Sequence, residues 1–255
     1  MPGTETGPSP DETSPLPPAA RLLAHTPWHE FEHAYAPGDI DLAATLAHLL
    51  HPQEATRLEA LGRLQGTVHH QNTICPATTP VALYITALLH DPRSEPTEVR
   101  DGLDRPLPLR AALLSWIAQI AYDTMEEVTA KRGFGFMPEE AAFRAIRPRL
   151  LEAVTVFTAS PDARIRHAAS AAALRLLDTD VELRRHQLRY AAVVEEILET
   201  STSGHHRATA LDALTAWGQD TTARWEAEMG RRQAEAAARQ DGTWWAGTFA
   251  TEPPF

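Results

Sequence analysis

One run of side chains in this sequence has the types and spacing to bind zinc, the H-E-F-E-H run at His29–His33. On a helix, an H-E-x-x-H pattern places two histidines on one face to hold the metal, and its glutamate acts as general base. Here acidic Glu32 stands at a middle position that is usually uncharged, and no further histidine follows at the spacing that would complete the site. The run therefore favours a helix with Trp28 and Phe31 packed inward. A zinc-dependent hydrolase is kept as the less favoured alternative, and we expect no metal and no cofactor.

A second group of potential ligands lies in the connector 69–75, which contains His69, His70 and Cys75. No fourth ligand follows at a fixed spacing, so the group favours a polar connector whose side chains satisfy neighbouring helix ends. His70 is expected to cap the preceding helix, and Cys75 to be a small buried residue. A single cysteine excludes an intramolecular disulfide and a four-cysteine zinc site.

Arginines are concentrated between residues 144 and 189, where nine arginines and five acidic residues give a local net charge of +4 (9 − 5). A stripe that includes Arg144, Arg147, Arg185 and Arg189, with Asp212 as an acid, resembles the basic DNA-binding face of HEAT-like alkylpurine DNA glycosylases. The net charge of the whole chain is −11, which disfavours nucleic acid as a partner. We therefore keep DNA glycosylase activity only as an alternative function.

The run K-R-G-F-G-F-M at 131–137 places two phenylalanines and a methionine around glycines. It lacks the pattern of a phosphate-binding loop. Such side chains form an adaptable contact surface or cover an edge of the fold, and the sequence leaves both open. The candidate residues for binding a partner are Phe134, Phe136, Met137, Trp28, His29, His33 and His70.

These residues must be positioned by a helical repeat, because four segments align on one arginine. The aligned arginines are Arg57, Arg110, Arg166 and Arg207. Small or apolar residues follow three positions later (Ala60, Leu113, Ala169, Ala210) and seven positions later (Leu64, Ile117, Ala173, Leu214). This periodicity predicts the buried face of an amphipathic helix in each segment, with Leu211 and Leu214 buried between stacked pairs.

The pattern predicts four helix pairs: 39–50 with 52–68, 80–90 with 106–122, 139–158 with 161–177, and 181–199 with 204–217. Loops are expected at 91–105 and 131–138. In the third pair, Ser160 is the expected N-cap and Asp162 is expected to pair with Arg166. Pro148 should kink the preceding helix or split it at Arg147. A closing helix over 221–240 is apolar at Trp225, Met229 and Ala236.

The repeated P-x-x-x-x-R-x-x-A-L pattern resembles that of HEAT-like repeat proteins. The stretches Trp28–Tyr35, Leu61–Leu64 and His70–Thr73 are similar to a group of small bacterial HEAT-repeat proteins without established activity, and the resemblance covers residues 20–218. It implies an all-α fold: a right-handed α-solenoid of about four HEAT-like helix pairs, with a helical cap at the N-terminus and a capping helix at the C-terminus. It implies binding of another macromolecule and no reaction.

Three regions follow from composition. Residues 1–18 contain six prolines and are expected to be a disordered tail, 19–240 form the helical domain, and 241–255 form a tail rich in aromatic residues that folds back onto it. The absence of a signal peptide and of a long apolar run favours a cytoplasmic protein without a membrane span. The expected function is a non-enzymatic scaffold or adaptor for another protein, and the acidic net charge favours a basic partner.

Overall fold

The computed structural model describes residues 16–35, 40–101, 105–132, 137–177 and 179–241. The tails expected at 1–18 and 241–255 lie almost entirely outside these ranges. Within them the chain forms twelve α-helices and one sheet of two short strands. The fold is therefore helical, as the periodicity predicts.

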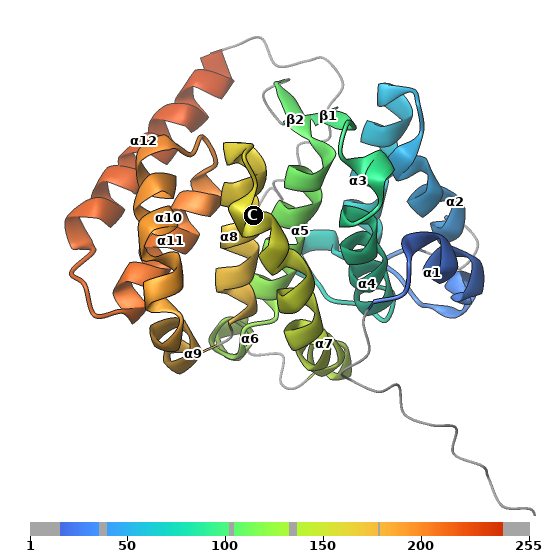
Figure 1. The fold of residues 1–255 in the computed structure, drawn as a ribbon, viewed down its shortest axis with the longest axis horizontal. Coiled ribbons are helices and arrows are strands. Elements are labelled where there is room, and N and C mark those ends of the chain that lie inside the picture. The colour runs from blue at the N-terminus through green and yellow to red at the C-terminus, as the bar shows by residue number, and fades with distance from the viewer. Residues whose placement is uncertain (1–15, 36–39, 102–104, 133–136, 178, 242–255) are drawn as a thin grey trace, which may run out of the picture.

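Eight of the helices form four consecutive pairs that stand side by side (Figure 1). The pairs are α2 (Leu42–Ala47) with α3 (Glu54–Val68), α4 (Thr78–Leu89) with α5 (Leu109–Asp123), α7 (Pro138–Thr155) with α8 (Ala163–Leu176), and α10 (Gln187–Thr200) with α11 (Gly204–Ala216). At one end α1 (Ala19–His25) packs on α2 and α4, and at the other α12 (Thr222–Asp241) packs on α11. Two short helices, α6 (Glu126–Arg132) and α9 (Asp180–Arg185), connect the pairs.

The two aligned columns of the repeat form the core. All eight side chains, three and seven positions after the repeated arginines, are between 0% and 3% exposed. Leu211 and Leu214 are buried as expected. The alignment on one arginine therefore identified equivalent inward positions in α3, α5, α8 and α11.

Each repeated arginine contacts the backbone before its own helix and a group of the unit that follows its pair. Each donates to a backbone carbonyl just before its own helix or in the segment leading to it: Arg57 to His51, Arg110 to Asp91, Arg166 to Ser160 and Arg207 to Ser201. Each also contacts the following unit: Arg57 the Glu98 carbonyl, Arg110 the Phe157 ring, Arg166 the Glu196 carboxylate and Arg207 the Glu228 carboxylate. These guanidinium groups satisfy carbonyl groups that the helices leave open.

The start of α8 differs from the prediction. The N-cap is Asp162, whose carboxylate accepts from the Arg164 N–H at 2.8 Å, and the helix begins at Ala163. Ser160 was wrong as the cap, because it ends the preceding turn η5 (Val156–Ala159) and lies two residues before the cap, Asp162. Asp162 also binds the Arg164 side chain, so Arg166 is left to reach Glu196 on α10.

A small hairpin replaces most of the loop expected at 91–105. After the turn η4 (Pro92–Ser94), β1 (Glu98–Arg100) pairs antiparallel with β2 (Pro106–Pro108), and Val99 lies opposite Leu107. The prediction of helix from residue 106 was therefore wrong by three residues. The two prolines flank the bonded pair, so their missing N–H groups remove no ladder hydrogen bond.

Three further segments differ from the sequence analysis. α7 runs without a break through Pro148, whereas the segment expected at 181–199 is divided at His186 into α9 and α10. On α12, Met229 is 49% exposed, whereas Trp225 is half-buried and Glu228, next to Arg207, is fully buried. The inward face of α12 therefore combines an ion pair with one of the expected apolar residues.

The helix α8 is the centre of the molecule, and its residues from His167 to Leu176 are buried. It packs against α5, α7, α10 and α11. The Ser115 hydroxyl of α5 lies 2.9 Å from Nε2 of His206 on α11, so these two helices meet across α8.

Candidate interaction surface

The H-E-F-E-H run does not form the helix that a zinc site of this pattern needs. Trp28–Glu30 is a single 3-10 turn (η1), and Phe31 follows in extended backbone. Trp28 is buried and its indole N–H donates to the Leu23 carbonyl at 3.0 Å, while His29 points into solvent. Within the described ranges, no three His, Cys, Asp or Glu side chains gather so that they could hold a metal ion.

Backbone hydrogen bonds instead fix the end of this segment between two helices. The Ala34 N–H donates to the Thr67 carbonyl of α3 at 3.0 Å, and the Ala77 N–H donates to the Glu32 carbonyl at 3.1 Å. The segment consequently brings Tyr35 to His70, with ring centroids 6.3 Å apart in an edge-to-face arrangement. His33 lies beside them, because its Nδ1 accepts from the Tyr35 N–H at 3.3 Å.

The connector after α3 contains two consecutive left-handed residues that are not glycine. In the turn η3 (His70–Asn72), Gln71 has φ 49° and ψ 41°, and Asn72 has φ 61°. This region costs L-residues with side chains about 1–3 kcal/mol each, and asparagine tolerates it better than glutamine. Both side chains are exposed. Two exposed side chains therefore stand on backbone of unfavourable conformation.

A buried hydrogen-bond network lies directly beneath η3. Asp123, at the end of α5, accepts from His69 Nε2 at 2.9 Å, from the Gln119 amide at 2.9 Å and from Arg132. Arg132 also donates to the Asn72 carbonyl at 3.0 Å. The carboxylate is 1% exposed, so these donors replace the water that it lacks.

The tautomer of His69 follows from its partners. The Trp116 indole N–H can only donate, and it points to His69 Nδ1 at 3.4 Å. Nδ1 is therefore the acceptor, and Nε2 carries the proton that Asp123 accepts. His69 thus serves as a buried link between α3 and α5, rather than as the metal ligand considered from the sequence.

We call Tyr35, His70, Gln71, Asn72 and Arg132 the η3 surface. It lies at the end of the molecule where α3 and α5 finish and where α4 and α7 begin (Figure 1). Met137, directly before α7, is 38% exposed at the same end. Phe134 and Phe136 lie outside the described residues.

Some of these residues escaped the sequence analysis. His70 was among the candidate residues for binding a partner and was also expected to cap the preceding helix, and its ring contacts Tyr35. Asn72 carried a signal, because asparagine just past a helix end favours left-handed backbone. Nothing in the spacing indicated that Arg132 and Asp123 would meet. Cys75 is partly buried, and its Sγ lies 3.6 Å from the Val68 carbonyl.

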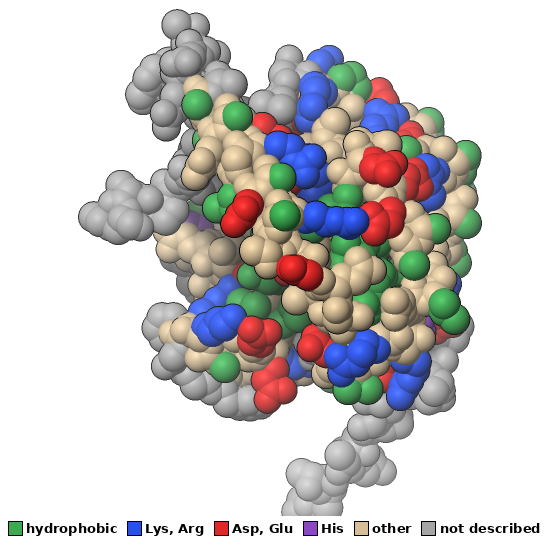
Figure 2. Space-filling model, turned by 90° about the vertical axis from the view of Figure 1, so that its left-hand side faces the viewer, with side chains coloured by type: hydrophobic (Ala, Val, Ile, Leu, Met, Phe, Trp, Pro, Cys, Tyr) green, Lys and Arg blue, Asp and Glu red, His purple; other side chains and the backbone are tan. Residues whose placement is uncertain are grey.

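The residues of the nucleic-acid alternative each have a partner within the described chain. Arg147 is 3% exposed and binds the Ala121 carbonyl at 2.6 Å, and Arg144 binds the Thr124 carbonyl at 2.7 Å. Asp212 pairs with Arg175 at 2.6 Å. Arg185 pairs with Glu182, and Arg189 lies over the Tyr190 ring. On the face that carries α12, basic and acidic side chains are intermingled (Figure 2).

Ser115 and His206 have the residue types of a nucleophile and its base, but the hydrogen bond between them runs in the wrong direction for that role. The Ser115 hydroxyl donates its only proton to the Ala111 carbonyl at 2.8 Å, so His206 must be the donor to Ser115. Burial, with smaller effects from His167, His205 and Arg207, lowers the pKa of His206 to about 3. The pair is a neutral bridge between α5 and α11.

Comparisons with protein-family models, with curated proteins and with solved structures found no match to this chain. Among the described residues, no helix is long and apolar enough to cross a membrane. The functional argument therefore rests on the residues of the chain itself.

Proposed function

We propose that this chain is a non-enzymatic HEAT-like scaffold, or adaptor, that binds another protein through the η3 surface. The four stacked pairs and their aligned arginines support the HEAT-like reading, and the proposal extends it to a right-handed α-solenoid. Composition supports a bacterial, cytoplasmic protein. No described cluster has the polarity or the geometry of a catalytic site, so recognition is the function that the residues support best.

The observation that carries the proposal is the pair of left-handed residues at Gln71 and Asn72. A chain selected only for stability has no need of such a backbone at an exposed turn, since strain of this kind clusters at binding sites. Here the strained turn is tied to α5 and α6 through Asp123 and Arg132. The side chains of η3 are thus presented rigidly, which lowers the entropy lost on binding.

The composition of the η3 surface also suits a protein partner. Tyr35 is 47% exposed although it is a large aromatic residue, and tyrosine and arginine are enriched among residues that dominate binding energy. On the neighbouring helix α6, Glu126 and Glu127 are balanced by Lys131 and Arg132. The preference for a basic partner therefore rests on the net charge of the whole chain, −11, through faster association.

The test is affinity purification from the host lysate with the wild-type chain and a double variant, Tyr35→Ala with His70→Ala. The matched control is Leu188→Ala, which removes a side chain that is 97% exposed on α10. We expect one stoichiometric protein to be retained by the wild type and the control. The double variant should bind it at least about 30-fold more weakly, since hot-spot residues contribute 2 kcal/mol or more.

Equal binding by all three proteins would contradict the role of the η3 surface. Retention of nucleic acid that is lost as salt rises would instead support the DNA glycosylase alternative. Far-ultraviolet circular dichroism and thermal unfolding of each variant establish that the substitutions leave the fold intact.

A further inference from the structure

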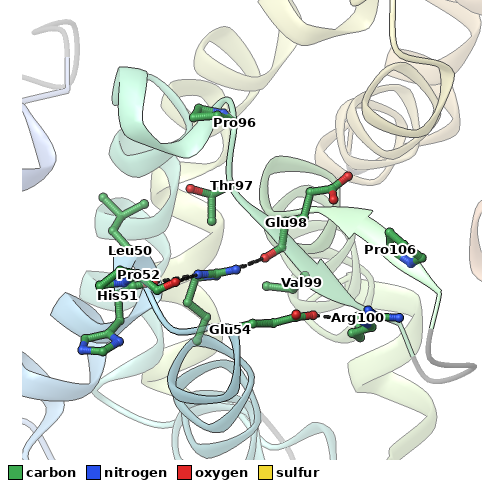
Figure 3. Close-up of a pocket in the computed structure, with 11 residues that line it drawn as sticks. Leu50, His51, Pro52, Glu54, Pro96, Thr97, Glu98, Val99, Arg100 and Pro106 are labelled. Carbon is green, nitrogen blue, oxygen red and sulfur yellow. Dashed lines mark hydrogen bonds and ion pairs between the residues drawn. The ribbon is translucent and has the colours of Figure 1, made fainter.

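An open hollow lies at the opposite end of the molecule from the η3 surface, between the start of α3 and the hairpin β1–β2 (Figure 3). Its volume is about 400 Å³, within the range of about 300–1,000 Å³ that is usual for small-molecule sites. Polar and charged side chains from both elements line it, including His51, Glu54, Arg57, Thr97 and Arg100. The hollow therefore suits a small polar ligand better than an apolar one.

Two side-chain bridges cross from α3 to β1 at this hollow (Figure 3). The Arg57 guanidinium donates to the Glu98 carbonyl from Nε at 3.0 Å and from Nη2 at 2.7 Å, and Arg100 Nε donates to the Glu54 carboxylate at 3.1 Å. Arg57 has five N–H groups, and two more of them bind the carbonyls of His51 and Pro52. Among the described residues, the fifth N–H of Arg57 and one carboxylate oxygen of Glu54 have no partner.

The other repeated arginines indicate which group is missing at Arg57. Each of the other three pairs with a carboxylate: Arg110 with Glu95 at 3.6 Å, Arg166 with Glu196, and Arg207 with Glu228 at 2.7 Å. Within the described ranges Arg57 has no such partner, because the hairpin presents a backbone carbonyl at this point. A ligand carboxylate would complete the pattern, since guanidinium and carboxylate groups form the stronger, charge-assisted hydrogen bonds.

The Glu54 side chain determines what else such a ligand must carry. Residues three apart on a helix are neighbours, so Glu54 and Arg57 lie side by side at the start of α3. The Glu54 carboxylate would repel a simple anion at Arg57, and the two arginines of the lining would repel a simple cation at Glu54. A ligand that carries both charges close together meets neither repulsion.

We propose that the hollow binds a free α-amino acid, with its carboxylate on the open N–H of Arg57 and its ammonium group on Glu54. An α-amino acid carries both charged groups on one carbon atom, as the neighbouring positions of Glu54 and Arg57 require. Two glutamates and two arginines line the hollow, so their charges balance and match a ligand of zero net charge. This site is separate from the η3 surface and adds a small-molecule ligand to the proposed binding of a protein.

The test titrates each of the twenty standard amino acids separately into the ¹⁵N-labelled full chain. NMR follows the side-chain Nε–H resonance of Arg57, which is assigned by its loss in Arg57→Lys. We expect a saturable shift with at least one amino acid. The amide and the N-acetyl derivative of that amino acid each lack one of the two charges and should bind at least about 10-fold more weakly.

The variant Glu54→Gln should weaken binding of the same amino acid at least about 10-fold, because it keeps an acceptor for Arg100 but loses the charge that pairs with the ammonium group. The matched control is Glu59→Gln, the same exchange at an exposed acid of α3 that pairs with Arg63, and it should leave the affinity unchanged.

The proposal is overturned if no amino acid gives a saturable shift, or if Glu54→Gln binds as tightly as the wild type. Equal affinity for acetate also overturns it, since the hollow would then bind a simple anion. The backbone amide spectrum of each variant verifies that the fold is retained.

Discussion

Replacement of His206 by glutamine tests the buried bridge between α5 and α11. His206 is 7% exposed, and its Nε2 lies 2.9 Å from the Ser115 hydroxyl. Glutamine offers an amide N–H donor near the same position but has no proton to gain at acidic pH. The variant therefore removes the titration of this site while it keeps a donor for Ser115.

The magnitude follows from the pKa of His206, which burial lowers from the ordinary 6.5 to about 3. Because the folded-state pKa is lower, the unfolded chain binds more protons between these values. The stability that neutral His206 allows is complete above pH 6.5 and is lost as the pH falls. From pH 7 to pH 4.5 the loss is about 2.5 kcal/mol, at about 1.36 kcal/mol per pH unit below 6.5.

Urea denaturation of the wild type and of His206→Gln at pH 7 and pH 4.5 measures this loss. The difference in unfolding free energy between the two proteins should shift by about 2.5 kcal/mol in favour of the variant at the lower pH. The control is Leu188→Ala, which removes a side chain that is 97% exposed and has no proton to gain, so it should give no shift. If the difference for His206→Gln stays constant between the two pH values, the account of a buried neutral histidine is refuted.

Three further substitutions address the core, the η3 network and α12. Leu214→Ala should lower the unfolding free energy by about 2–5 kcal/mol, whereas Leu188→Ala at an exposed site should change it by under about 0.5 kcal/mol, both measured in urea. Asp123→Asn removes the buried ionised acceptor of Arg132 and should cost about 3–5 kcal/mol, so a thermal midpoint equal to that of the wild type would speak against the network. Burial alone would raise the pKa of Glu228, but hydrogen bonds from Arg207 and Arg232 lower it. Glu228→Gln should therefore accelerate hydrogen exchange in α12 more than in the four pairs, and uniform exchange would contradict this.

The sequence by itself determined the helices and their inward faces. Apolar side chains that recur every three and four residues can be buried together only on a helix, so the repeated arginine and its two columns located the core of α3, α5, α8 and α11. The sequence predicted the ends of the helices less accurately, because neighbouring residues can compete for the same capping position. Asp162 rather than Ser160 caps α8, because both can accept the hydrogen bond and the carboxylate next to the helix is the one in position.

The tertiary structure alone decided which polar groups meet. Asp123 and His69 are 54 residues apart in sequence. Arg132 reaches the same carboxylate from α6, a short helix that the repeat pattern did not predict. The burial of Glu228 on α12 likewise depends on Arg207, which lies 21 residues earlier in the sequence. Hydrogen bonds and ion pairs between distant residues have no period along the chain. The η3 surface therefore became visible only once the helices were placed together.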